Sequence, residues 1–235
     1  MPPPTLPDRA ARSRFRRRLL AWYGRHRRDL PWRRTDDPYR ILVSEIMLQQ
    51  TQVERVVPKY HEFLDRYPTL EALAGSAPEE VKHLWYPLGY NIRPLNLHGI
   101  AREAVASYGG RLPDDGAALR RMRGIGRYTA GALLCFAYGR AVPIVDTNVR
   151  RVLGRVFLGP RRLGRLRGQK TMWDLAGALV PPRKAYDYNQ ALMDFGAIWC
   201  TARAPRCPPC PMKRFCATYR ATPGRRERND GHARR

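Results

Sequence analysis

The sequence predicts an all-α fold. Apolar residues recur at helical spacing along most of the chain, and proline or glycine stands where one predicted helix gives way to the next. Strict alternation of apolar and polar residues, which is typical of half-buried strands, is nearly absent. With 235 residues, the chain is long enough for one large domain or for two smaller lobes with a stable core.

The predicted helices in the first half of the chain share apolar residues at three- and four-residue spacing. They cover residues 13 to 27, residues 39 to 56, three short segments between residues 58 and 87, and residues 94 to 108. The second of them carries Leu42, Ile46 and Val53 on one side. Either Asp114 or Asp115 is expected to cap the helix that follows.

Two further helices are joined by Gly124, Ile125 and Gly126. Glycine permits a tight turn and lets the backbone approach a ligand closely. The amides at the start of the second helix, from Arg127 onward, would then face outward at the positive end of the helix dipole. Such an arrangement binds a phosphate without reading base sequence. An ordinary corner between two helices has the same pattern, so both interpretations stay open at this point.

Four cysteines follow near the C-terminus, Cys200, Cys207, Cys210 and Cys216, separated by six, two and five residues. Thiolates select soft or borderline metals, so the spacing favours a [4Fe–4S] cluster or one tetrahedral zinc ion. Zinc ribbons usually contain two C-x-x-C pairs, whereas one such pair occurs here, which favours the cluster. Disulfides are the weaker interpretation, because nothing marks the chain as secreted. Cys135 lies in an apolar run and is expected to be a small buried side chain.

Charge points to a polyanionic partner. The chain has 44 Lys and Arg residues against 20 Asp and Glu residues, a formal net charge of +24. Neutralising phosphates releases counterions and supplies sequence-independent affinity for nucleic acid. Heavy use of arginine across a whole proteome is the alternative, although it leaves the shortage of acids unexplained. No apolar run is long enough to span a bilayer or to form a secretory signal. We therefore expect a cytoplasmic, nucleoid-associated monomer, with no membrane partner.

The hairpin, the segment Val-Asp-Thr-Asn-Val at residues 145 to 149 and the cysteine loop occur in one order and spacing. Together they resemble the helix-hairpin-helix DNA glycosylases with an iron–sulfur cluster, notably endonuclease III and MutY. The resemblance covers residues 14 to 219. It implies a six-helix barrel lobe at residues 31–146, inserted into a cluster lobe made of residues 1–30 and 147–219. A DNA-binding cleft would lie between the lobes, and residues 220–235 would form a basic, disordered tail.

Within this family, the chain looks most similar to the adenine glycosylase MutY. The similarity lies in Leu30-Pro31-Trp32, in residues 44 to 53, in Leu88-Gly89-Tyr90 and in residues 126 to 131. It implies removal of adenine opposite 8-oxoguanine or guanine in double-stranded DNA. Full-length MutY proteins carry a C-terminal domain that recognises 8-oxoguanine, and this chain is expected to lack it. A mismatch-specific thymine or uracil glycosylase is the nearest alternative, because that shorter relative has a similar length and also has a tyrosine at position 128.

The resemblance also implies a catalytic set. Asp146 would be the anion that stabilises the positively charged sugar or traps it covalently, and Glu45 would deliver a proton to the leaving base. Tyr128 stands where endonuclease III has the lysine that forms a Schiff base, so base excision without efficient strand cleavage is implied. Asn148 would position Asp146 or the catalytic water. Each carboxylate also has a non-catalytic interpretation. Asp146 would simply cap a helix, and Glu45 would be a surface carboxylate on an amphipathic helix.

The DNA contacts implied by the resemblance fall into two groups. One group would wedge beside the base left unpaired when the target nucleotide is flipped out, and the other would hold the phosphate backbone. They are Gln50, Thr51, Leu88 and Tyr90 for the wedge and Gly124, Gly126 and Arg127 for the backbone. The alternative interpretation of Tyr90 is an ordinary half-buried aromatic residue with no role in DNA binding. Arg123, Asn91 and Pro94 depart from the MutY pattern.

A function outside catalysis is also compatible with the hairpin, the cysteines and the charge. The chain would then be a DNA-binding module whose pocket does nothing. A pair of carboxylates beside phosphates argues against that interpretation, because a pure binder gains nothing from acidic groups there.

Overall fold

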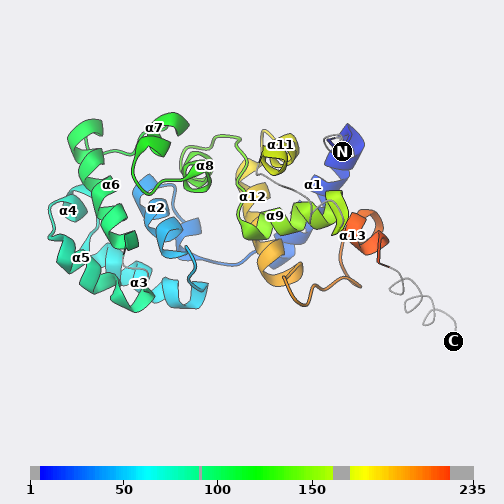
Figure 1. Ribbon diagram of the computed structural model, residues 1–235, viewed down its shortest axis with the longest axis horizontal. Helices are drawn as coiled ribbons and strands as arrows, with labels where there is room; N and C mark the ends of the chain where they lie inside the picture. Colours follow the sequence, from blue (N-terminus) through cyan, green and yellow to red (C-terminus); the bar gives the residue numbers. More distant parts are fainter. Residues whose placement is uncertain (1–5, 90–91, 161–169, 223–235) are drawn as a thin grey trace. The chain divides into compact units, whose positions relative to one another are not determined.

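The computed structural model describes residues 6–89, 92–160 and 170–222. Every element in these ranges is a helix of the α, 3₁₀ or π type, and they contain no strand (Figure 1). The all-α prediction is confirmed. None of the described helices combines the length and the apolar character that a membrane span needs.

The chain divides into two compact units. One is continuous and runs from Asp29 to Arg140, and the other combines Met1–Arg28 with Ala141–Arg235. Asp146 therefore belongs to the discontinuous unit, whereas the boundary expected from the sequence placed it at the end of the continuous one. The difference arises because the segment that follows Arg140 packs with the later helices, as when Asn189 donates from Nδ2 to the Val142 carbonyl at 3.0 Å.

The continuous unit contains helices separated by short turns. They are η1 (Pro31–Arg33), α2 (Pro38–Met47), α3 (Val53–Arg66), α4 (Leu70–Ala74), α5 (Pro78–Trp85), η2 (Tyr86–Leu88), α6 (Ile92–Tyr108), α7 (Gly116–Arg121) and α8 (Arg127–Phe136). Helix α6 packs on α4 and α5, and α2 packs on α8. Asp115 caps α7, since its Oδ2 accepts from the Ala118 amide at 2.7 Å, which confirms the expected cap.

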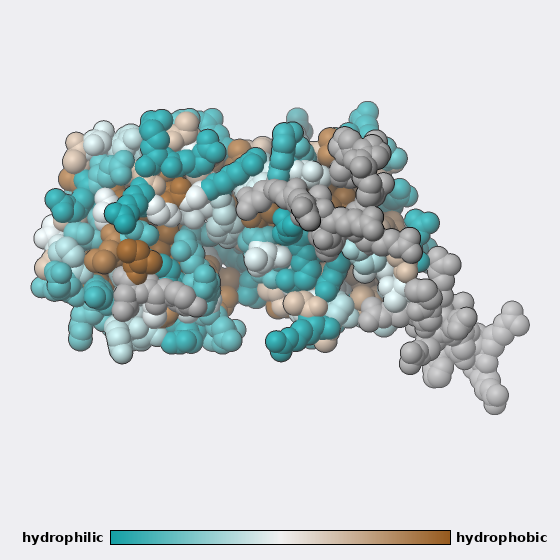
Figure 2. Space-filling view, viewed as in Figure 1, coloured by the Kyte–Doolittle hydropathy of each residue, from teal (hydrophilic) through white to brown (hydrophobic). Residues whose placement is uncertain are grey.

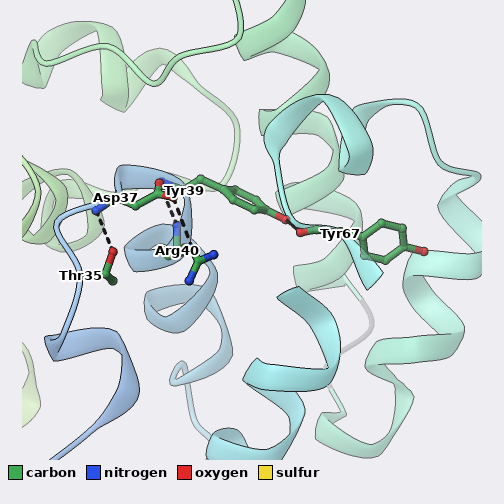
Figure 3. A network of polar contacts seen from close by, with 5 residues as sticks. All are labelled: Thr35, Asp37, Tyr39, Arg40 and Tyr67. Carbon is green, nitrogen blue, oxygen red and sulfur yellow. Dashed lines mark hydrogen bonds and ion pairs between the residues drawn. The ribbon is translucent and has the colours of Figure 1, made fainter. Parts of the chain in front are cut away.

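The first turn of α2 shows why this helix begins where it does (Figure 3). Asp37 accepts hydrogen bonds from the amides of Tyr39 and Arg40, and the Thr35 hydroxyl accepts from the Asp37 amide. A carboxylate at this position satisfies amides that have no partner within the helix. The buried Tyr39 hydroxyl donates to the Tyr67 carbonyl at 2.7 Å, so the end of α3 is tied to the start of α2. Burial raises the pKa of this tyrosine well above its ordinary range.

The discontinuous unit draws on both ends of the chain. Its helices are α1 (Arg9–His26), α9 (Thr147–Leu153), the π-helix η3 (Gly154–Leu158), α11 (Lys170–Leu179), α12 (Ala185–Asp194), the π-helix η4 (Phe195–Trp199), η5 (Lys213–Phe215) and α13 (Ala217–Arg220). Helix α1 packs on α12. The buried Asp194 accepts from Arg28 Nε at 2.7 Å and from the Arg28 amide at 3.2 Å, which fastens the end of the N-terminal segment.

One predicted helix is wrong. The sequence predicts a single helix over residues 39 to 56, but the structure ends α2 at Met47 and begins α3 at Val53. Between them Gln50 adopts a φ of 57°, in the left-handed region that non-glycine residues rarely occupy. The apolar periodicity of Leu42, Ile46 and Val53 continues across this break, so the pattern alone does not reveal it. Pro58, where the first of the predicted short segments begins, lies inside α3.

Candidate active site and cysteine cluster

Helix α2 carries Glu45, and the structure buries it. The side chain of Glu45 is only 5% exposed, and its neighbours Val43 and Ile46 are at most 1% exposed. The interpretation of Glu45 as a surface carboxylate is therefore wrong. It fails because nearly all of α2 lies inside the unit, including the polar Ser44, whose hydroxyl donates to the Ile41 carbonyl at 2.8 Å.

The predicted wedge residues differ in how far they are exposed to solvent. Gln50 is exposed and strained at the α2–α3 break, and Thr51 beside it is half-buried. Leu88, at the end of η2, is 4% exposed, so its side chain belongs to the core of the unit. Gly89 follows with a φ of 71°. Tyr90 lies outside the described residues. Only Gln50 of this set is freely presented on the surface of the described structure.

Exposed apolar surface also occurs in this part of the unit (Figure 2). Tyr86 in η2 is 71% exposed, and Ile92 and Leu95 lie one turn apart near the start of α6. No motif in the sequence marks these residues. Their signal was weak, because single exposed apolar residues are common on protein surfaces.

The hairpin joins α7 to α8 as predicted. Gly124 has a φ of 96°, and a Cβ added there would stand 2.9 Å from the Asn96 Cβ of α6, so the position requires glycine for two reasons. Ile125 is buried and anchors the turn, whereas Gly124, Gly126 and Arg127 are exposed. Gly126 is the N-cap residue of this ten-residue helix, and it has no side chain that could accept hydrogen bonds from the first amides of α8. Tyr128 lies in the first turn and is half-buried.

Asp146 begins α9. Its Oδ1 accepts from the Val149 amide at 2.6 Å, and its Oδ2 accepts from the Asn148 side-chain amide at 3.0 Å. The residue is thus a helix cap, as its plain interpretation predicts. Burial raises the pKa of this carboxyl above its ordinary value, and the hydrogen bonds from Val149 and Asn148 and the charge of Arg151 oppose that rise. The carboxylate is held in one orientation, partly shielded from water, by groups of its own helix.

Arg151 connects this carboxylate to the cysteine segment. Its Nη2 donates to Asn148 Oδ1 at 2.7 Å and to the Gly196 carbonyl at 2.7 Å, and its Nε donates to the Cys200 carbonyl at 2.9 Å. A planar guanidinium suits such a set of acceptors, because its donors point in several fixed directions. Sequence reasoning missed Arg151. The sequence did contain one indication of its role, because Arg151 follows Asp146 by five residues and lies on the short helix that Asp146 caps.

The four predicted metal-binding cysteines line one cavity of about 280 Å³ in the discontinuous unit. Burial raises the pKa of the Cys210 thiol to about 12, and the neighbouring Cys200, Cys216 and Cys207 add to the rise. The pKa of Cys216 is also raised, chiefly by burial.

Basic and backbone groups surround this cavity. Arg155 in η3 donates from Nη1 to the Cys200 sulfur at 3.5 Å and to the Thr201 carbonyl at 2.6 Å, and the Met212 amide donates to the Cys210 sulfur at 3.4 Å. In the described ranges, no disulfide joins any cysteine, and no three His, Cys, Asp or Glu side chains form a group suited to a metal ion. Cys135 is buried in α8 of the other unit, as expected.

Comparison with known proteins identifies the family. Residues 43–176 match the family described as "HhH-GPD superfamily base excision DNA repair protein". The human adenine DNA glycosylase is 42% identical over 219 residues, which is 89% of this chain and 40% of the human protein. The thymine/uracil-DNA glycosylase of Pyrobaculum aerophilum is 36% identical and covers 88% of this chain and 92% of its own length.

A solved structure of a thermostable thymine-DNA glycosylase has a TM-score of 0.85 and 36% identity, and covers 91% of this chain and 98% of its own. The chain spans less than half the length of the human relative. The family resemblance inferred from the hairpin, the Val-Asp-Thr-Asn-Val segment and the cysteines is confirmed. This chain belongs to the HhH-GPD superfamily of base excision DNA repair proteins.

Proposed function

We propose that this protein is a monofunctional DNA glycosylase, which hydrolyses the N-glycosidic bond of a mispaired base in double-stranded DNA. The observation that carries the proposal is the half-buried Asp146 carboxylate, held by Val149 and Asn148 at the start of α9. Breaking the bond puts positive charge on the deoxyribose and negative charge on the leaving base. A fixed carboxylate stabilises the first of these charges, because it needs no reorientation during the reaction.

Glu45 is proposed as the proton donor to the leaving base. Its burial supports this role, since removal from water favours the protonated form of carboxyl groups in general, and a proton donor needs that form. Two carboxylates in different environments then divide the work, one as an anion and one as an acid. Asn148 is proposed as the residue that positions Asp146 or the attacking water.

Tyr128 supports the monofunctional assignment. A phenol does not form an imine with the sugar, so the route to strand cleavage through a Schiff base at this position is closed. The excised site would remain as an intact abasic strand that breaks only on treatment with alkali. Gly124, Gly126 and Arg127 are proposed to hold the DNA backbone through exposed amides and one positive charge, in a protein with a net charge of +24.

Adenine opposite 8-oxoguanine or guanine is the proposed substrate. The support is the 42% identity to the human adenine enzyme together with Gln50, Thr51 and Asn148 of the adenine-type pattern. Thymine or uracil opposite guanine is the second candidate, favoured by the 36% identical relative that covers 92% of its own length. The monomeric state and the cytoplasmic, nucleoid-associated location remain part of this proposal.

A panel of labelled duplexes is expected to separate the two candidates. Duplexes with A·8-oxoguanine, A·G, G·T and G·U pairs are incubated with the protein and then treated with alkali. We expect cleavage of the adenine strand in the first two. Cleavage confined to G·T and G·U would overturn the adenine assignment, and cleavage without alkali would overturn the monofunctional one.

A [4Fe–4S] cluster is the proposed cofactor, ligated by Cys200, Cys207, Cys210 and Cys216. The donor set fits, because four thiolates suit an iron–sulfur cluster. The four cysteines also line one cavity, which supports a single shared group rather than separate roles for them. The cluster would supply a rigid crosslink for the loop that contains Lys213 and Arg214.

The purified protein is therefore expected to be brown, with broad absorbance near roughly 400 nm. Cys210→Ser is expected to lose the colour and the bound iron, because it removes one of four ligands. Cys135→Ala is the matched control and keeps both, since Cys135 lies in the other unit. A colourless wild-type protein with one zinc per chain would refute the cluster.

A further inference from the structure

Arg93, near the start of α6, is a buried arginine. Its side chain is 5% exposed, although long cationic side chains are rarely buried unless their donors are satisfied. The guanidinium also lies over the Trp85 ring, 5.5 Å from the ring centre, which is a favourable place for a cation. In the sequence, Arg93 stands between Asn91 and Pro94, two residues that depart from the family pattern.

One set of Arg93 contacts holds the break between α2 and α3. Its Nη1 donates to the carbonyls of Ile46 at 3.1 Å, Met47 at 2.9 Å and Gln49, and its Nη2 donates to Thr51 Oγ1 at 3.1 Å. The last carbonyls of a helix have no partner within it and attract cations. Arg93 thus satisfies the end of α2 and fixes the residues on both sides of the left-handed Gln50.

A second set of contacts holds the turn after η2. Arg93 Nη2 donates to the carbonyls of Leu88 at 3.0 Å and Gly89 at 3.1 Å. Gly89 also has a positive φ, so two backbone segments in unusual conformations meet at one guanidinium. Far apart in sequence, the segments 46–51 and 88–89 are joined through a single side chain.

We propose that Arg93 is a positioning residue that holds these two segments as one DNA-contacting surface, with Gln50 exposed at its edge. The proposal rests on the proposed glycosylase function. An apolar side chain would fill the same space without the cost of burying a charge, but it would remove the donor that the Met47 carbonyl shares with those of Leu88 and Gly89. Strained backbone such as that of Gln50 persists where surrounding contacts impose it. Lysine lacks the planar fork that reaches both segments at once.

The test compares Arg93→Lys with the wild-type protein and with Ile100→Val, a core change on the same helix two turns away. Hydrogen exchange of peptides covering residues 46–51 and 88–89 is measured with and without a duplex that carries a tetrahydrofuran abasic analogue. We expect exchange in both segments to speed up together in Arg93→Lys, and DNA to protect both in the wild type and in Ile100→Val but neither in Arg93→Lys. The proposal would be overturned if Ile100→Val lost as much DNA protection in these segments as Arg93→Lys does. It would also be overturned if DNA protected both segments fully in Arg93→Lys.

Catalysis provides a separate readout. The single-turnover rate of Arg93→Lys on the preferred mispair is expected to fall on the order of a hundredfold, the size of effect that a small displacement near a reacting group produces. Affinity for undamaged duplex is expected to stay close to that of Ile100→Val. If the wild type excises no base, the glycosylase proposal fails, whereas the exchange experiment still decides the role of Arg93.

Discussion

Asp146→Asn is expected to abolish base excision while leaving the fold and DNA binding intact. Removing a charge that stabilises the sugar cation is expected to cost about a thousandfold in rate, the upper end of the loss when one key electrostatic group is removed from other enzymes. Asparagine caps a helix as well as aspartate does, so the hydrogen bond from the Val149 amide persists. Single-turnover excision and a gel-shift titration with a mispaired duplex measure the two properties.

Stability provides an independent check on this substitution. The pKa of Asp146 is raised in the folded protein, mainly by burial. As pH rises past the ordinary pKa of aspartate, Asp146 loses its proton in the unfolded chain but keeps it in the folded protein. The free energy of unfolding therefore falls with rising pH until Asp146 has also ionised in the folded protein. Asparagine lacks this effect, and the thermal midpoint of Asp146→Asn at neutral pH is therefore expected not to fall.

Asp146→Asn also separates an enzyme from a DNA-binding module. Wild-type excision that disappears in the variant, with affinity retained, supports catalysis. A wild type that binds mispaired DNA without excising any base, and a variant indistinguishable from it, would point to the binding module instead. The wild-type excision rate is further expected to decline as pH falls through the raised pKa of Asp146, because the protonated carboxyl no longer stabilises a cation.

Gly196→Ala is the second substitution with a large expected effect. A Cβ at position 196 would stand 2.7 Å from the Asn148 Cβ, closer than real Cβ atoms approach, and 3.2 Å from its Cα, which is a tight contact. The obstacle is the backbone of α9, so the start of that helix must shift. Overpacking of this kind costs about 1–3 kcal/mol of stability. Because the shifted residues include the partners of Asp146, the excision rate is expected to fall on the order of a hundredfold.

Gly24→Ala is the matched control for this experiment. Gly24 lies within α1 of the same unit, and a Cβ there would meet no atom within 4 Å. Alanine in a helix interior is favoured over glycine by about 0.5–1 kcal/mol, so this variant is expected to be slightly more stable and fully active. Thermal denaturation and single-turnover kinetics measure both variants. Full activity in Gly196→Ala would show that the Asn148 position tolerates displacement.

Local chemistry explains which features could be predicted from the sequence. The cap at Asp115 depends on a side chain three residues from its partner amide, and the cysteines that line one cavity are close in the chain. Such features are readable because chain connectivity already brings the groups together. Gly124 is similar, although its contact with Asn96 adds a reason for glycine that the pattern did not contain.

Features that depend on distant residues were missed or mistaken. The break after Met47 is stabilised by Arg93, 46 residues later, so helical periodicity continued through it without a warning. The burial of Glu45 likewise depends on helices that cover α2 from other parts of the chain, such as α8. Tertiary packing decided both outcomes, and neither is encoded in a window of neighbouring residues.

The division into one continuous and one interrupted unit has a consequence for biogenesis. Residues 29 to 140 emerge from the ribosome as an uninterrupted stretch and contain every helix of their own unit. Domains generally fold as units during synthesis, from the N-terminal side onward. Helix α1 precedes this stretch but packs on α12, so more than 150 residues are translated between α1 and its partner. We therefore expect the continuous unit to fold before α1 packs on α12.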